Sequence, residues 1–285
     1  MCGALITLSI TAGVNFFVTA VLLEPISVDT GWTIGQVSTG ITIWGLVAAI
    51  LSPALGALID RYGARRMMLL GCTINLVSTF LLSRVDSLWQ FYAVLAVAPV
   101  GAMLNTFIPV AAVVAKWFIK FRGIATGIAM LGLGVGGAIA PQIAAVLLDT
   151  YSWRETYAFL SIAFPIAMVP VLFLVRNPDP EVEQAYAAQI AEGLGPLNDL
   201  TFQQALRTRS FWSLSLGDML TGLVFAVFNV QLVVFITRDY GDRDSATQIF
   251  SLFLLMLAGG TLVFGPLADR FSMKRVLVLC YALPA

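Results

Sequence analysis

The chain has 285 residues, of which 59% are apolar and only 11% are charged, and its formal net charge at pH 7 is zero. Soluble domains carry roughly 25% charged residues, so this composition excludes an ordinary water-soluble protein and predicts a membrane protein with the lipid bilayer as a partner. The neutral balance gives no indication of a nucleic-acid partner, and a sequence with no histidine and three isolated cysteines predicts neither a metal site nor a cofactor.

Eight apolar stretches are long enough to cross a bilayer, since a spanning helix needs about 20 residues. Their length and the absence of alternating polarity favour helices over the strands of a barrel. Glu24 and Pro25 are interpreted as the end of the first span, and a ninth apolar stretch begins near residue 275. The predicted spans are residues 2–23, 33–59, 67–84, 89–115, 123–148, 155–175, 210–236 and 246–268.

Cations in the short loops predict the orientation, because cytoplasmic loops carry an excess of lysine and arginine. With the N-terminus in the cytoplasm, twelve of the 16 cations lie in cytoplasmic loops and four lie in outer loops. We therefore expect a multi-pass protein of a cell membrane, either a plasma membrane or a bacterial inner membrane, with a cytoplasmic N-terminus.

A charged loop occurs twice in the chain and indicates an internal duplication. Residues 56–66 follow the second predicted span, and residues 265–275 repeat the pattern after the eighth span with an offset of 209. Matching loops at matching places in the hydropathy pattern indicate two parallel copies of one helical bundle. The residues singled out are Gly56, Asp60, Arg61, Gly63, Arg65 and Arg66 in the first copy and Gly265, Asp269, Arg270, Lys274 and Arg275 in the second.

The duplication predicts a domain organisation of two halves. Residues 1–175 hold the first six spans and form an N-terminal six-helix bundle, and the polar segment 176–208 is a cytoplasmic linker. Residues 209–285 form an incomplete C-terminal bundle that contains helices seven and eight and the start of helix nine. A mirrored second half continues for about 100 residues and about three further helices, so we expect the chain to be truncated at its C-terminus.

The first loop resembles the signature that the major facilitator superfamily carries between its second and third helices, in sequence, position and side of the membrane. The second copy falls between helices eight and nine, again as in that superfamily, with Ser272 in place of the second glycine. The stretch from Trp117 to Gly136 is similar to the start of helix five in monocarboxylate porters and oxalate/formate antiporters. The resemblance implies an all-α polytopic membrane protein with two repeats of about six helices each, the last three or so being missing.

By this resemblance the two charged loops act as a conformational latch between the halves, whereas a plain anchor that fixes the topology is the alternative. Cations of the loop can bind phosphates or carboxylates, Asp60 can accept hydrogen bonds at a helix end, and the glycines permit close approach of helices. Helix five carries Gly132, Gly136 and Pro141, which predict either a hinge seam or simple tight packing.

Polar side chains at mid-membrane depth are candidates for contact with a solute, because lipid penalises them unless they face a cavity or a partner. An interhelical hydrogen bond, worth about 0.6 kcal/mol on average, is the alternative for each of them. Asp218 is the only carboxylate well inside a predicted span and is a candidate for carrying a coupling proton, unless it pairs with an arginine or is hydrated. The other candidates are Asn15, Asn105, Asn229 and Gln231, on helices that line the central path in the superfamily, and Gln142 on helix five.

These features predict a secondary active transporter that moves a small solute by alternating access. The sequence has no ATP-binding motif and no cluster of catalytic groups, so we expect no enzyme activity and transport driven by a gradient, for example of protons. By resemblance the favoured solute is a small organic anion such as a monocarboxylate. Neutral or amphiphilic solutes, and a non-transporting sensor or scaffold of the same fold, are the alternatives. We expect a monomer.

Overall fold

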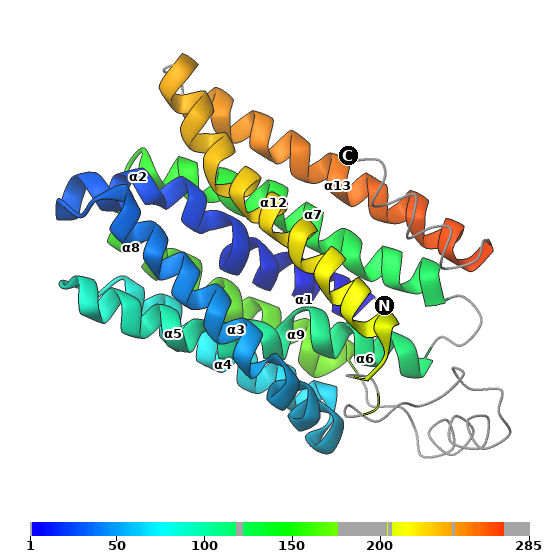
Figure 1. Ribbon diagram of the computed structural model, residues 1–285. Helices are drawn as coiled ribbons and strands as arrows, with labels where there is room; N and C mark the ends of the chain where they lie inside the picture. Colours follow the sequence, from blue (N-terminus) through cyan, green and yellow to red (C-terminus); the bar gives the residue numbers. More distant parts are fainter. Residues whose placement is uncertain (1, 118–121, 176–203, 205–206, 241–242, 271–285) are drawn as a thin grey trace, which may run out of the picture.

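A computed structural model describes residues 2–117, 122–175, 204, 207–240 and 243–270, and in these ranges every regular element is a helix (Figure 1). The all-helical fold that the composition predicts is therefore confirmed. The predicted start of a ninth span near residue 275 and most of the predicted linker, 176–208, lie outside the described residues.

The helices follow the predicted spans closely. Counted over the described residues only, seven helical stretches are long and apolar enough to cross a membrane; α12 coincides with the predicted span 210–236 but is not one of the seven. The bounds are α1 Cys2–Ala12, a π-helical turn η1 Gly13–Phe17, α2 Val18–Thr30, α3 Ile34–Tyr62, α4 Ala64–Leu82, α5 Leu88–Asn105, α6 Phe107–Trp117, α7 Arg122–Leu148, α8 Trp153–Ser161, α9 Ala163–Leu174, α12 Arg209–Tyr240 and α13 Arg243–Arg270.

The first span ends later than the sequence predicted. Pro25 lies inside α2, and the helix continues to Thr30, where Gly31 ends it with a φ of 72° and donates its N–H to Ser27 O. A proline inside a membrane helix is tolerated because neighbouring groups satisfy the carbonyl that it leaves free. Glycine adopts the left-handed conformation without steric cost, so Gly31 rather than Pro25 is the stop signal.

Three helices begin with the same capping arrangement. In α3, α5 and α8 a Ser or Thr side chain accepts from the backbone N–H three residues on, and a Gln or Glu at that position bonds back to the backbone of the cap. This capping box satisfies N–H groups that a helix start leaves without partners. The three pairs are Thr33 with Gln36, Ser87 with Gln90, and Ser152 with Glu155.

The loops near these helix starts are joined through Arg154. Its guanidinium donates to the carboxylate of Asp29, at the end of α2, and to the carbonyl oxygen of Val85, between α4 and α5, at 3.1 Å. Trp153 Nε1 also donates to Asp29 at 2.8 Å, and Asp86 lies 3.9 Å from Arg154. One end of the N-terminal bundle, which we call the Gly31 end, is thereby held together by one arginine.

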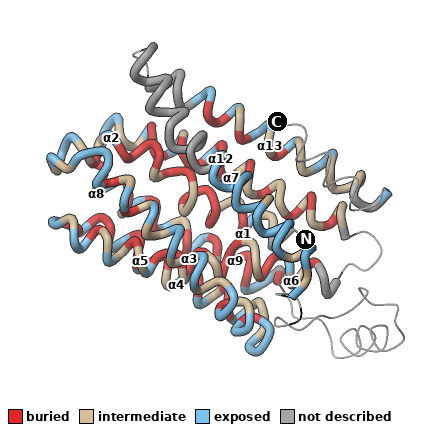
Figure 2. The backbone as a smooth tube through the Cα atoms, in the orientation of Figure 1, coloured by how far each residue is buried: buried red, intermediate tan, exposed pale blue. Residues whose placement is uncertain are grey.

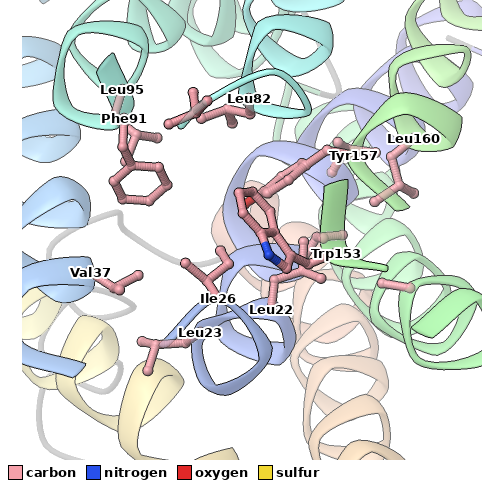
Figure 3. Packing of buried hydrophobic residues seen from close by; sticks show 14 of the residues in the cluster. Leu22, Leu23, Ile26, Val37, Leu82, Phe91, Leu95, Trp153, Tyr157 and Leu160 are labelled. Carbon is pink, nitrogen blue, oxygen red and sulfur yellow. The ribbon is translucent and has the colours of Figure 1, made fainter. Parts of the chain in front are cut away.

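The main apolar core lies towards the Gly31 end and joins all six spans of the N-terminal half. Side chains of α2, α3, α4, α5, α7 and α8 meet there, with Trp153 and Tyr157 of α8 beside Leu22 and Ile26 of α2 (Figure 3). A smaller cluster at the opposite end, the Gly63 end, joins α4, α6, α7 and α9. Figure 2 shows buried residues on α1, α2, α4, α5 and α7, whereas the described part of α12 is mostly exposed.

Helix α7 packs against α1 on one face and against α13 on another, in both places through glycines. A Cβ at Gly132 would lie 2.5 Å from Leu5 O of α1, and one at Gly136 would collide with the backbone of Ser9. On another face, a Cβ at Gly127 would lie 2.6 Å from Thr261 O of α13. Backbones approach this closely only where glycine leaves out the side chain. In Figure 1 α13 runs alongside α7.

Candidate functional site

Three spans of the N-terminal half are interrupted, the sixth at Ile162 between α8 and α9. The interruptions of the first and fourth spans lie close to each other. The first contains the π-helical turn Gly13–Phe17, and the fourth is interrupted at Thr106, which has φ −114° and ψ −113° between α5 and α6. Non-helical backbone at membrane depth is tolerated only where protein buries it or where it lines a cavity, and single π-turns occur frequently at functional sites. These two interruptions therefore mark a candidate site.

Three asparagines connect the two interruptions. In the amide orientation that satisfies both its oxygen and its nitrogen, Asn75 of α4 accepts from Asn15 Nδ2 and from Asn105 Nδ2, each at 3.0 Å, and donates to Ala98 O at 3.0 Å. Asn75 and Asn105 are both fully buried. Asn15 belongs to the π-turn, and Asn105 is the last residue of α5. The cluster joins spans one, three and four through side-chain hydrogen bonds.

A cavity of about 420 Å³ opens beside this cluster. Its size falls within the range of roughly 300–1,000 Å³ that small-molecule sites occupy. None of the described residues that line it carries a charge; its polar lining consists of Asn15, Thr19, Thr79 and Tyr157. The cavity can therefore offer hydrogen bonds to a solute, but its described walls provide no ion pair.

Aromatic rings form one corner of the cavity. The Phe16 ring packs edge-on against Trp44, with centroids 5.1 Å apart and planes at 78°, and against Phe107 at 5.6 Å. All three line the cavity. Phe17 and Tyr157 add a fourth and a fifth ring. Tyr157 is only 3% exposed, and its hydroxyl makes no well-formed hydrogen bond within the described residues, although Thr19 lies beside it.

The polar residues that the sequence singled out do not all meet at this cavity. Asn15 lines it, and Asn105 is buried in the asparagine cluster behind it. Gln142 lies between the halves instead, where its Nε2 donates to Ser251 Oγ of α13 at 3.0 Å. Asn229 and Gln231 lie on α12, but their side chains are outside the described residues. Asp218 is exposed on α12.

Sequence reasoning missed two residues of the site. Asn75 has the same signal as Asn15, a lone amide within an apolar span, but it lies on the third span, which the family resemblance does not assign to the central path. Tyr157 gave no signal, because a tyrosine near the start of a span is typical of the membrane interface. Only the packing shows that its hydroxyl is buried without a well-formed hydrogen bond within the described residues.

The first charged loop has a defined conformation at the Gly63 end. Gly63 links α3 to α4 with φ 84° and ψ 145°, a combination that only glycine adopts readily. Arg65 Nη2 donates to Leu172 O in the last turn of α9 at 2.6 Å, which fastens the loop to the end of span six. Asp60, Arg61 and Arg66 are exposed, and Gly56 faces open space.

The second loop is described only in part. Gly265 packs against α7, because a Cβ there would lie 2.7 Å from Gly123 O. Arg270 is exposed. The side chain of Asp269, and Lys274 and Arg275 altogether, lie outside the described residues. Pro141 of the predicted packing set is buried within α7, on the same helix as Gly132 and Gly136.

The helical bundle, the cavity in its first half and the charged loops define a polytopic membrane protein of the transporter class. The sequence profile of the Major Facilitator Superfamily matches residues 4–285, and the chain belongs to that superfamily, whose members are transporters rather than enzymes. This confirms the superfamily that the first charged loop indicated.

The names of individual relatives refer to different solutes. The chain is 33% identical to a riboflavin transporter of Trypanosoma cruzi over 52% of this chain, and 27% identical to a nitrite extrusion protein of Bacillus subtilis over 97% of this chain and 67% of that protein. A yeast transporter, from Saccharomyces cerevisiae, is 25% identical over 84% of this chain. The chain spans only 32% of the trypanosome protein and 35% of the yeast protein.

Proposed function

We propose that the protein is a secondary active transporter that moves a small solute by alternating access, and that the cavity beside the asparagine cluster is the part of the solute site that the N-terminal half contributes. The observation that carries this proposal is the coincidence of the cavity with the interruptions of spans one and four. Interrupted helices at the middle of the membrane form the binding sites of many secondary transporters.

The walls of the cavity favour a neutral or amphiphilic solute over the organic anion that the family resemblance suggested. An anion is held most strongly by a cation, and none of the described lining residues carries a positive charge. The name of the trypanosome relative, a riboflavin transporter, agrees with an uncharged solute, whereas the bacterial nitrite extrusion protein handles an anion. A monocarboxylate, and membership of the monocarboxylate-porter or oxalate/formate branch, remain the alternative.

Reconstitution of the full chain into liposomes tests this function. Uptake of radiolabelled neutral and anionic solutes is measured with and without an imposed proton gradient, and protein-free liposomes are the control. We expect accumulation that an uncoupler abolishes. A sensor or scaffold of the same fold binds a solute without accumulating it, so saturable binding with no uptake of any solute would contradict the proposal.

Two charged positions carry the coupling and gating parts of this proposal. We infer that Asp218 carries the coupling proton, because it is a carboxylate within a predicted span, and that Asp60 belongs to the latch between the halves. Asp218→Asn should then abolish accumulation but allow exchange of solute, and Asp60→Asn should slow uptake while insertion stays intact. The proposal further includes a six-helix N-terminal bundle, a cytoplasmic linker, a cytoplasmic N-terminus, a monomer and a cell-membrane location.

A further inference from the structure

We propose that the cavity selects an uncharged, planar, aromatic solute that carries both N–H and carbonyl groups, and that Tyr157 donates a hydrogen bond to it; this inference rests on the proposed function. The chemical class follows from three properties of the described walls, namely their lack of charge, the shape of the aromatic corner, and the hydrogen-bonding groups that can still bond to a solute.

The lack of charge excludes solutes whose binding needs an ion pair. A charged group that leaves water for an uncharged, mostly apolar cavity loses its hydration without compensation. The cavity of about 420 Å³ is lined mainly by aliphatic and aromatic side chains, so burial of apolar surface supplies most of the binding free energy. A neutral solute with a large apolar surface fits this balance.

The aromatic corner favours a flat ring. Phe16 and Trp44 meet at 78° with centroids 5.1 Å apart, so the planes of two neighbouring lining rings are nearly perpendicular. Aromatic rings prefer offset-stacked and edge-to-face contacts, and a planar solute in such a corner makes both at once. Phe107 adds a third ring, with its centroid 5.6 Å from that of Phe16.

The polar groups define a donor and an acceptor. The hydroxyl of Tyr157 is buried, with the Thr19 side chain as its polar neighbour and no well-formed hydrogen bond within the described residues, so it can still donate to a solute. Asn15 Nδ2 donates to Thr11 O at 2.7 Å and to Asn75, which uses both of its hydrogens and leaves its Oδ1 as an acceptor. The site therefore complements a ring that bears a carbonyl oxygen and an N–H group.

Binding of lumichrome to the purified full chain tests the inference. Lumichrome is an uncharged tricyclic ring with carbonyl and N–H groups; benzoate supplies an anionic ring, and ribitol supplies a neutral, non-aromatic solute. Equilibrium dialysis should show saturable binding of lumichrome and none of the other two at the same concentration. Absence of lumichrome binding, or tighter binding of benzoate, overturns the proposal.

Matched variants assign the contacts. Tyr157→Phe removes only a hydroxyl that has Thr19 beside it and no well-formed hydrogen bond within the described residues, so folding should be unchanged while lumichrome binds about tenfold more weakly. Trp44→Leu should weaken the binding of lumichrome at least as much. Tyr151→Phe and Trp89→Leu are the controls, because both side chains are exposed and lie outside the cavity lining. Affinity equal to wild type in both cavity variants overturns the assignment.

The two experiments distinguish a wrong solute class from a wrong transport function. If another solute accumulates in liposomes and lumichrome does not bind, the solute class is wrong and the transporter stands. If lumichrome binds with the expected effects at Tyr157 and Trp44 but no solute accumulates, the site stands and transport is wrong.

Discussion

Substitution of Gly134 by alanine tests whether the seam between α7 and α13 controls the contact between the halves. An added Cβ at this position would lie 2.6 Å from Leu254 O and would also collide with the Cβ of Ala258, both on α13. Neither a backbone carbonyl nor an alanine Cβ can rotate away, so α13 must retreat by at least about 1.1 Å to bring the Ala258 Cβ to the 3.4 Å of ordinary van der Waals contact. Overpacking of this kind costs about 1–3 kcal/mol.

The added Cβ raises the free energy of the conformation in which α7 and α13 are packed together. A change of about 1–3 kcal/mol alters a two-state equilibrium by roughly 5- to 150-fold, so the packed state loses population while the N-terminal half keeps its own core. The expected result is a lower rate of cross-linking between α7 and α13 and an altered turnover of transport. The natural position for the cross-link is Gln142 with Ser251, whose side chains are 3.0 Å apart.

The measurement uses cysteines at these two positions in a chain whose native cysteines are replaced, with a short bifunctional reagent and densitometry of the product. Gly259→Ala is the matched control; Gly259 lies on α13, and no atom lies within 4 Å of a Cβ added there. It should be neutral or slightly stabilising, since alanine favours a helix by up to about 1 kcal/mol over glycine. Equal cross-linking rates in the Gly134 and Gly259 variants would refute the argument.

Three further predictions concern the loops of the N-terminal half. Gly63→Ala should lower the free energy of unfolding in detergent by about 1–3 kcal/mol, because alanine is strained at φ 84°, and an unchanged melting temperature would contradict this. Arg65→Ala should loosen the end of span six by removing the donor to Leu172 O and raise proteolysis there, whereas Arg66→Ala, at an exposed position, should not. Asp29→Asn should lower the thermal midpoint, because it weakens the acceptor of two donors, and equal midpoints in high and low salt would argue against an ionic contribution.

The spans were predictable because lipid imposes a simple length rule on apolar helices. The second and third spans, predicted as 33–59 and 67–84, are α3 Ile34–Tyr62 and α4 Ala64–Leu82. The errors lie at backbone irregularities. Residues 89–115 were predicted as one helix, and the interruption at Thr106 went unnoticed, although Pro109 cannot donate to the carbonyl of Asn105 and its ring crowds that carbonyl. The true stop of the first span was Gly31, whose positive φ a hydropathy pattern does not reveal.

The site was less predictable than the fold. A lone asparagine in an apolar span signals either a hydrogen bond or a solute contact, and the sequence does not choose between them. Asn15 takes both roles, bonding to Asn75 while lining the cavity, and Asn105 is buried in the cluster. The choice depends on which neighbours the packing brings within about 3 Å, and that is a property of three helices together rather than of any one segment.

The junction made by Arg154 at the Gly31 end also provides a reference frame for spectroscopy. Because one guanidinium contacts Asp29 and the loop at Val85 and Asp86, the ends of several spans share a common anchor. Spin labels on two of these loops should give one narrow distance distribution that does not change when solute is added or a gradient is imposed. This ruler distance serves as an internal reference. A third label on α13 then measures displacement of the second half against a fixed baseline, and any broadening of the ruler distance itself would reveal deformation within the first half.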